Sequence, residues 1–164
     1  MIIRYEGGNS GVIAYLEDGK KLGRDLQRDE IDHRVMLRGD PALTDSIINS
    51  IKDKGQDRYE RIVISFFEDD IATEKMEEIV NDYKSLLMSA YEDEEYDFYA
   101  EAHIPKVKHD IDIETGELIE RKPHIHIVIP NKNLVTGGSL HPVGLAKLNT
   151  DYLDAIQETL NKKH

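Results

Sequence analysis

The chain has 164 residues, a formal net charge of −12 and no cysteine. This length suits one domain with a substantial hydrophobic core, so we expect a single domain over residues 1–164, which could be the N-terminal part of a longer protein. The lack of cysteine excludes disulfides and thiolate metal sites. No apolar run approaches the roughly 20 residues of a membrane span, and no signal region begins the chain. We therefore expect a cytoplasmic protein without membrane insertion.

The negative charge is concentrated in one segment. Between Phe67 and Glu101 there are 13 acidic residues, with only Lys75 and Lys84 as bases. The remaining residues are nearly neutral, with 20 acids and 19 bases. Nucleic acid prefers a basic surface, so the net charge argues against that partner. Its concentration in one segment predicts a solvated acidic face that lies away from any polyanion.

Periodicity and turn residues divide the chain into strands and helices. Strands are predicted over 2–5, 59–67, 96–104 and 124–129. Helices are predicted over 11–18, 41–55, 73–90 and 150–163, whereas 29–38 is ambiguous between helix and strand. Asp40 followed by Pro41 is typical of a helix start. This order predicts an α+β fold, a two-layer sandwich with a central antiparallel sheet and helices packed mainly on one face.

The most informative segment is KPHIHIVIPNKN, over residues 122–133. It alternates with a period of two, so His124 and His126 must point to one face of a strand. The isoleucines at 125, 127 and 129 must point to the other face. Such a strand buries its isoleucines and presents two imidazoles side by side, which is a suitable platform for a metal ion.

A third histidine is predicted from which positions of the preceding strand, odd or even, share a face with His124 and His126. If a hairpin folds about the turn at Thr115 and Gly116, residue i lies opposite residue 231 − i, and odd positions share the face of the two histidines. His103 and Glu101 are then on that face, while the apolar even positions join the isoleucines. His109 has the same parity and is the alternative third ligand. We prefer His103 because it lies within the regularly alternating strand.

Three neutral imidazoles with open coordination positions suit a divalent ion that polarises a substrate oxygen. The alternative is a half-exposed strand with incidental histidines. The prediction that His103 shares a face of the sheet with His124 and His126 favours the metal site.

These residues resemble a known family. Histidine, a bulky apolar residue and histidine on a strand resemble the motif of the HUH endonucleases. The wider pair AEAHIPK (100–106) and PHIHIVIPNKNL (123–134) is similar to the metal motif of conjugative relaxases, and IVISFF before a long helix resembles a recurrent strand of those enzymes. GVIAYLEDGKK with the downstream RDEIDHRV resembles the segment that carries the relaxase nucleophile, which places Tyr15 in that role.

The resemblance covers most of the chain and implies a palm-like antiparallel sheet and a specific reaction. A relaxase nicks and rejoins single-stranded DNA at a transfer origin, for conjugation or plasmid mobilisation. Its tyrosine forms a 5′-phosphotyrosine while a divalent ion binds the phosphate oxygens. We expect manganese or magnesium first, with zinc or nickel as alternatives. The expected partners are single-stranded DNA and accessory relaxosome proteins.

The resemblance also assigns supporting roles. Glu101 would orient one of the histidines from behind the metal. A basic cluster after the tyrosine would hold the DNA backbone near the nucleophile. Its members are Lys20, Lys21, Arg24 and Arg28.

Alternatives remain open at this point. Tyr15 could be a core aromatic residue, and Tyr152 is the rival nucleophile, because it lies on the helix where single-tyrosine transposases and replication initiators carry theirs. Packing beside Leu153 and Ile156 also explains Tyr152. A non-catalytic relaxase relative that binds DNA or a protein partner is a further alternative. A histidine-triad hydrolase is excluded, because its nucleophilic histidine would stand where Val128 does.

Overall fold

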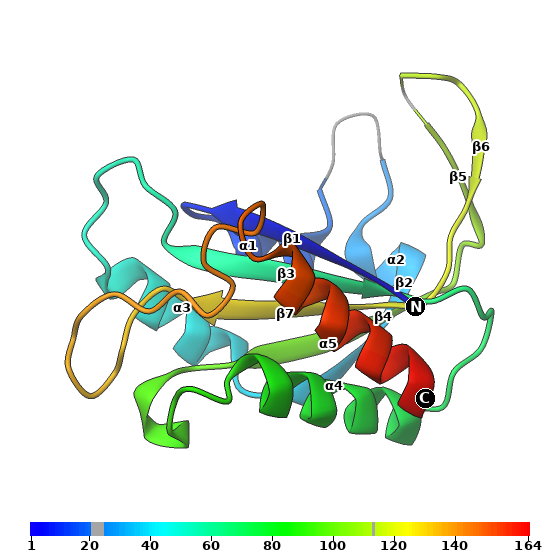
Figure 1. Ribbon diagram of the computed structural model, residues 1–164. Coiled ribbons are helices and arrows are strands. Elements are labelled where there is room, and N and C mark those ends of the chain that lie inside the picture. The colour runs from blue at the N-terminus through cyan, green and yellow to red at the C-terminus, as the bar shows by residue number, and fades with distance from the viewer. Residues whose placement is uncertain (21–24, 113) are drawn as a thin grey trace.

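The computed structural model describes residues 1–20, 25–112 and 114–164. Its centre is a five-stranded antiparallel sheet with the strand order β1-β3-β7-β4-β2 (Figure 1). The strands are β1 (Ile2–Gly8), β2 (Asp32–Arg38), β3 (Tyr59–Ser65), β4 (Tyr99–Pro105) and β7 (His124–Pro130). The strand of the two histidines, β7, is therefore the middle strand. The predicted α+β fold with a central antiparallel sheet is confirmed.

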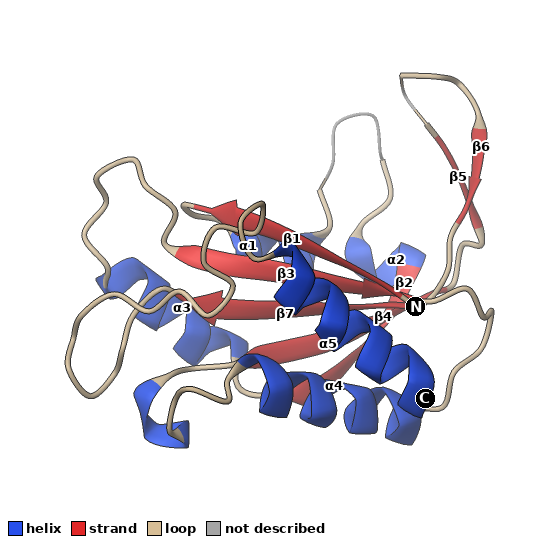
Figure 2. Cartoon of the chain, in the orientation of Figure 1, coloured by secondary structure: helices blue, strands red, loops and turns tan. Residues whose placement is uncertain are grey.

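Two long helices, α4 and α5, lie together on one face of the sheet (Figure 2). On the other face, α1 and α3 pack at one end against a smaller cluster around Tyr99 and Val128. The helices are α1 (Val12–Asp18), α2 (Arg28–Ile31), α3 (Pro41–Ser50), α4 (Thr73–Leu87) and α5 (Thr150–Lys163), with a 3₁₀ turn η1 (Asp93–Glu95). The ambiguous segment thus divides into α2 and β2, and α3 ends earlier than predicted.

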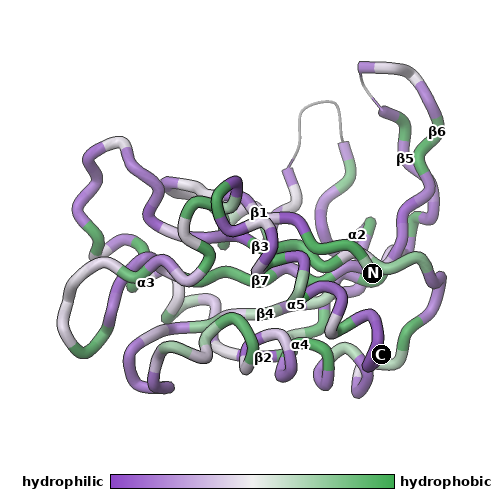
Figure 3. The backbone as a smooth tube through the Cα atoms, viewed as in Figure 1, coloured by the Kyte–Doolittle hydropathy of each residue, from purple (hydrophilic) through white to green (hydrophobic). Residues whose placement is uncertain are grey.

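The main core lies between the sheet and the two long helices. The isoleucines of β7 are completely buried there, together with Ile62 and Ile64 of β3. The hydropathy of the backbone follows this arrangement, since the central strands are apolar and polar residues alternate along the helices (Figure 3). The acidic helix α4 therefore lies on the face opposite to His124 and His126.

The register of β4 against β7 differs from the prediction. His103 lies opposite His124 and Glu101 lies opposite His126, so paired residues sum to 227 rather than 231. The shift is an even number of residues, so every side chain keeps its predicted face.

Two local features cause this difference in register. The tip of the predicted hairpin is a separate two-stranded arm, β5 (His109–Ile111) and β6 (Leu118–Glu120). Its turn is fixed by the Asp112 side chain, which accepts hydrogen bonds from the backbone N–H groups of Glu114 and Thr115 at 2.8 and 3.1 Å. Below the arm, the N–H groups of Lys106 and Val107 both donate to Ile31. The chain bulges there by two residues.

Truncation of the central strand tests this core. Ile127 is 0 % exposed, so Ile127→Ala should lower the free energy of unfolding by about 2–5 kcal/mol through lost burial and a new cavity. Ile119 on β6 is 45 % exposed, and Ile119→Ala should change it by less than about 0.5 kcal/mol. Chemical denaturation of both variants measures the difference. Equal effects would contradict the placement of the core.

Candidate functional site

Three histidines from two neighbouring strands form a compact cluster. Their ring centroids are 4.6 Å apart for His103 and His126, 4.9 Å for His124 and His126, and 5.3 Å for His103 and His124. One ligand nitrogen from each ring lies within 4.8 Å of the others. His103 and His126 are buried, and His124 is half-buried at the edge of a cleft. The predicted triad, with His103 as the third member, could hold a metal ion.

The hydrogen bonds of the rings fit a metal site. The Nδ1–H of His124 donates a hydrogen bond to the Lys122 carbonyl at 3.0 Å. The lone pair of Nε2 is then available to bind a metal ion. His103 bonds to Glu101 through Nε2, and its buried Nδ1 has no hydrogen-bond partner among the described residues. The Nδ1 of His126 is likewise buried without a partner in the described chain. Metal-binding histidines usually donate their second N–H to a carboxylate or a carbonyl, as two of these rings do.

Glu101 stands behind the cluster and is 1 % exposed. Its carboxylate accepts two hydrogen bonds from Arg34, at 3.1 Å from Nε and 2.6 Å from Nη2, and further bonds from His103 and the Tyr99 hydroxyl. Burial alone would raise the pKa of Glu101, but the hydrogen bonds from His103, Arg34 and Tyr99 outweigh it and lower the pKa to about 2. Glu101 therefore stays ionised and fixes the ring of His103.

Asp32 is a second buried carboxylate at the site, and the sequence did not single it out. It accepts from Arg28 Nη1 and Arg121 Nη2, each at 2.7 Å, and its Oδ2 lies 3.9 Å from His103 Nδ1. Burial opposes ionisation, but these two arginines lower the pKa of Asp32. Asp32 thus joins α2, the base of the β5–β6 arm and the histidine cluster.

Tyr15 lies in the same cleft as two of the histidines. The cleft has a volume of about 530 Å³, and its lining includes Tyr15, His124 and His126. The guanidinium carbons of Arg28 and Arg61 lie 5.3 and 5.5 Å from the centroid of the Tyr15 ring. Gly19 ends α1 in the left-handed conformation, with φ = 67°, and its N–H donates to the Tyr15 carbonyl at 2.9 Å. The end of this short helix is thereby defined.

The cleft is basic although the protein is acidic. Its lining contains two acidic residues, Glu6 and Glu120, against a larger set of bases. These bases are Arg4, Arg28, Arg61, Arg121 and Lys122. The acidic α4 covers the opposite face of the sheet. The charge distribution therefore favours an anionic ligand in the cleft.

The alternative site residues lie elsewhere. Tyr152 is on α5, on the opposite face of the sheet, where its hydroxyl donates to the Leu86 carbonyl at 2.9 Å. His109 is exposed on β5, opposite Glu120, and does not belong to the cluster. The structure therefore places Tyr15 in the cleft and His103 in the histidine cluster. Neither Tyr152 nor His109 lies at these places.

The predicted basic cluster is only partly described. Lys20 is exposed after α1, while Lys21 and Arg24 lie outside the described residues. Arg28 is buried rather than exposed, because it pairs with Asp32 and donates from Nε to the Leu16 carbonyl at 3.1 Å. Arg28 thus contacts Asp32, the end of α1 and the ring of Tyr15 together.

Sequence reasoning missed the other cationic residues of the cleft. Arg61 lies two residues before Val63, which pairs with His126, so its side chain has the same facing as the histidines. Its buried Nε has no hydrogen-bond partner within the described ranges. The alternation within YERIVIS carried this signal, but only the pairing of β3 with β7 shows that Arg61 points into the cleft.

Comparisons with protein families, curated proteins and solved structures give no match for this chain. Within the described part of the chain, no helix combines the length and the apolar character needed to cross a membrane. The site must therefore be interpreted from its own geometry.

Replacement of the clustered histidines should remove metal binding. The His124→Ala, His126→Ala double variant loses two of three ligands, so manganese at 1,000 times its Kd should no longer add the roughly 4 kcal/mol of stability expected of the unaltered protein. His109→Ala is the matched control, because His109 lies outside the cluster. Calorimetric titration and thermal melts would measure both. Retained affinity in the double variant would contradict the assignment.

Metal binding should persist to lower pH than free imidazole would allow. Burial lowers the pKa of His124 to about 4 and the pKa of His126 well below its ordinary value. Both rings therefore stay neutral below pH 6, where unfolded histidine, with a pKa near 6.5, becomes protonated. The apparent Kd for manganese should change less than about threefold between pH 7.5 and 5.5. A loss of about tenfold or more over the same range would refute this.

The same pKa shift makes folding depend on pH. Because the pKa of His124 is depressed in the folded protein, its contribution to stability is complete above about pH 6.5 and is lost as the pH falls toward about 4.

Proposed function

We propose that this chain is a metal-dependent DNA-nicking enzyme of the relaxase type, within the HUH endonuclease superfamily. The observation that carries the proposal is that Tyr15, His124 and His126 line one basic cleft in an otherwise acidic protein. A nucleophile, candidate metal ligands and excess positive charge are what phosphodiester transfer to a tyrosine requires.

The proposed reaction exchanges one phosphodiester bond for another. The Tyr15 hydroxyl oxygen attacks the scissile phosphorus of single-stranded DNA, and the bond from phosphorus to the 3′ oxygen breaks. The phenolic proton leaves to water in the open cleft, and the departing 3′ oxygen takes a proton from water, so the products are a 5′-phosphotyrosine and a free 3′-hydroxyl. A 3′-hydroxyl can later attack the phosphotyrosine and rejoin the strand, because the covalent bond conserves the energy of the phosphodiester.

A divalent ion at His103, His124 and His126 would supply positive charge to the non-bridging phosphate oxygens. Three imidazoles suit manganese, nickel or zinc better than magnesium, which prefers oxygen ligands and keeps its water. We therefore infer that manganese is a better working ion for this site than magnesium.

The two arginines beside Tyr15 have distinct proposed roles. Arg28 is held by Asp32 and by the Leu16 carbonyl of α1, and its guanidinium packs on the Tyr15 ring, so its proposed role is to position that ring. Among the described residues, the Nε of Arg61 has no hydrogen-bond partner, and Arg61 forms one ion pair, of 3.4 Å, with the exposed Glu6. Arg61 is therefore available to bind a phosphate oxygen as negative charge develops there.

The proposed substrate is single-stranded DNA at a transfer origin, with accessory relaxosome proteins as further partners. The cleft supports this through its charge and through the exposed Phe67, which lies on its lining and can stack on an unpaired base. No observation favours Tyr152 as the nucleophile, because its hydroxyl bonds to α4 on the far face.

Tyrosine substitutions test the reaction directly. Tyr15→Phe should lower formation of the covalent adduct on a labelled single-stranded origin oligonucleotide by at least about a thousandfold, because the attacking oxygen is lost. Tyr152→Phe is the matched control and should retain the activity. Adducts resolved on denaturing gels, with manganese and with chelator, measure both. Loss of adduct only in Tyr152→Phe would establish the transposase-like arrangement, and no adduct in any protein would establish a non-catalytic role.

A further inference from the structure

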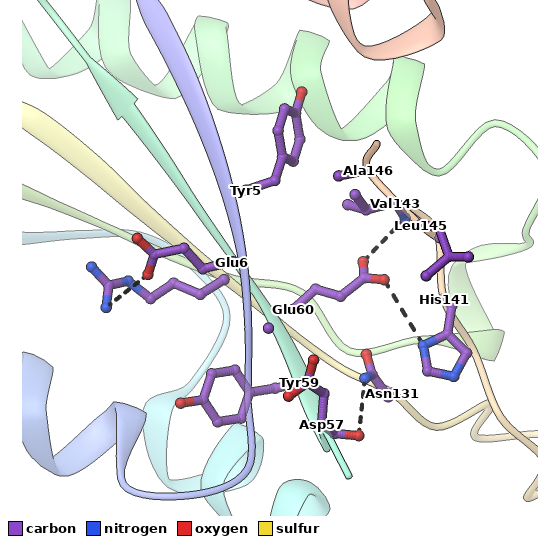
Figure 4. A pocket seen from close by; sticks show the side chains of 13 residues that line it. Tyr5, Glu6, Asp57, Tyr59, Glu60, Asn131, His141, Val143, Leu145 and Ala146 are labelled. Atoms are coloured by element: carbon purple, nitrogen blue, oxygen red, sulfur yellow. Dashed lines mark hydrogen bonds and ion pairs between the residues drawn. The ribbon is translucent and has the colours of Figure 1, made fainter. Parts of the chain in front are cut away.

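A second cavity, of about 500 Å³, lies beside the cleft at the edge of the sheet. It is bounded by β1, by the start of β3 and by the loop from His141 to Ala146 (Figure 4). Its walls include the apolar side chains of Val143, Leu145 and Ala146. Pockets of this size and character are typical of small-ligand sites.

Glu60 projects from β3 into this cavity, toward the loop (Figure 4). The residue is 7 % exposed, and its carboxylate accepts a hydrogen bond from the Val143 N–H at 3.1 Å. Its other oxygen lies 4.0 Å from His141 Nδ1. No lysine or arginine among the described residues forms an ion pair with Glu60. Burial raises the pKa of Glu60 to about 7, although hydrogen bonds from the backbone of Val143 and Gly144 oppose this shift.

A second unsatisfied acceptor lines the same cavity. Asn131 is 6 % exposed, and its Oδ1 is buried without a hydrogen-bond partner in the described part of the chain. Its Nδ2 donates to the Asp57 carbonyl at 3.4 Å. This hydrogen bond sets the orientation of the side-chain amide, so Oδ1 is the atom without a partner. Buried polar atoms are nearly always hydrogen-bonded in folded proteins. A ligand in the cavity that donates hydrogen bonds would satisfy this oxygen.

We propose that this cavity binds a guanine base of single-stranded DNA. Guanine carries an N1–H donor beside an exocyclic N2 amino group, and this adjacent pair matches the two oxygens of the Glu60 carboxylate. Asn131 Oδ1 offers a further acceptor, and the apolar loop residues contact the flat faces of the base. Adenine, cytosine and thymine each lack two adjacent donors on their pairing edges. A simple ammonium ion would not need an apolar cavity of this volume.

The cavity adjoins the proposed cleavage site, so this inference rests on the proposed function for the origin of the guanine. Glu6 and Arg61 line both the cleft and the cavity. Glu60 is three residues from Val63, which pairs with His126, so it lies about 10 Å away along the strand and its side chain points to the opposite face of the sheet. A DNA strand with its scissile phosphate at Tyr15 would cross the β1 edge of the sheet, beside Glu6 and Arg61, to place a base a few nucleotides away in the cavity. The cavity would then determine which sequence is nicked.

Binding of mononucleotides to the metal-free protein tests this without any cleavage. We expect dGMP to shift the backbone amide resonances of Val143 and Gly144, with dIMP, which lacks the N2 amino group, and dAMP each binding at least roughly tenfold more weakly. Glu60→Gln should abolish the preference for dGMP, because the amide presents a donor where guanine also donates. Asp57→Asn alters a different carboxylate of the cavity lining and should keep the preference.

Three results would overturn the assignment. They are equal affinity for dGMP and dAMP, an unchanged preference in Glu60→Gln, and displacement of dGMP by a tighter-binding alkylamine, which would indicate a cation site. The assay needs neither Tyr15 nor metal, so the base preference can be found in a protein that does not nick DNA. Conversely, nicking without a base preference would refute only the guanine site.

Discussion

The pairing of β4 with β7 is the constraint on which the rest of the structure depends. It sets His103 opposite His124 and Glu101 opposite His126. The same pairing turns the isoleucines of β7 toward the long helices, so the core and the histidine cluster form together. A slip of one residue would bury the imidazoles among apolar side chains and expose the isoleucines. The hydrophobic effect therefore decides the face on which the polar site forms, because the facing that buries the isoleucines also turns the three imidazoles to one side.

Two buried carboxylates hold the assembled site in place. Glu101 is bound by Arg34, Tyr99 and His103, and Asp32 is bound by Arg28 and Arg121. A buried charge is costly unless it is paired and hydrogen-bonded, and both carboxylates satisfy this condition. Since Arg28 also contacts the end of α1 and the ring of Tyr15, the histidine cluster and the proposed nucleophile share one connected network. The side chains of the protein itself thus hold the histidines and Tyr15 in position.

The sequence could predict what depends on local periodicity. The alternation of β4 and β7 determines which side chains share a face, so the three histidines and Glu101 were accessible from the sequence. The register was not, because the bulge at Lys106 and Val107 and the turn at Asp112 are fixed by side chains and by Ile31, far away along the chain. Arg61 and Glu60 were missed because their surroundings depend on which strands flank β3. The long spacing between His103 and His124 is explained by the β5–β6 arm, which is inserted between the two ligand strands.

The central claim is that the proposed nucleophile and the metal site share one face of the sheet. Fluorine NMR of protein labelled with 3-fluorotyrosine, with resonances assigned by single Tyr→Phe variants, measures this directly when manganese is added. Paramagnetic broadening should be strongest for Tyr99, whose hydroxyl bonds to Glu101, and for Tyr15 in the cleft. Tyr152 should broaden least among these three, because α5 lies across the sheet. Stronger broadening of Tyr152 than of Tyr15 would contradict the account.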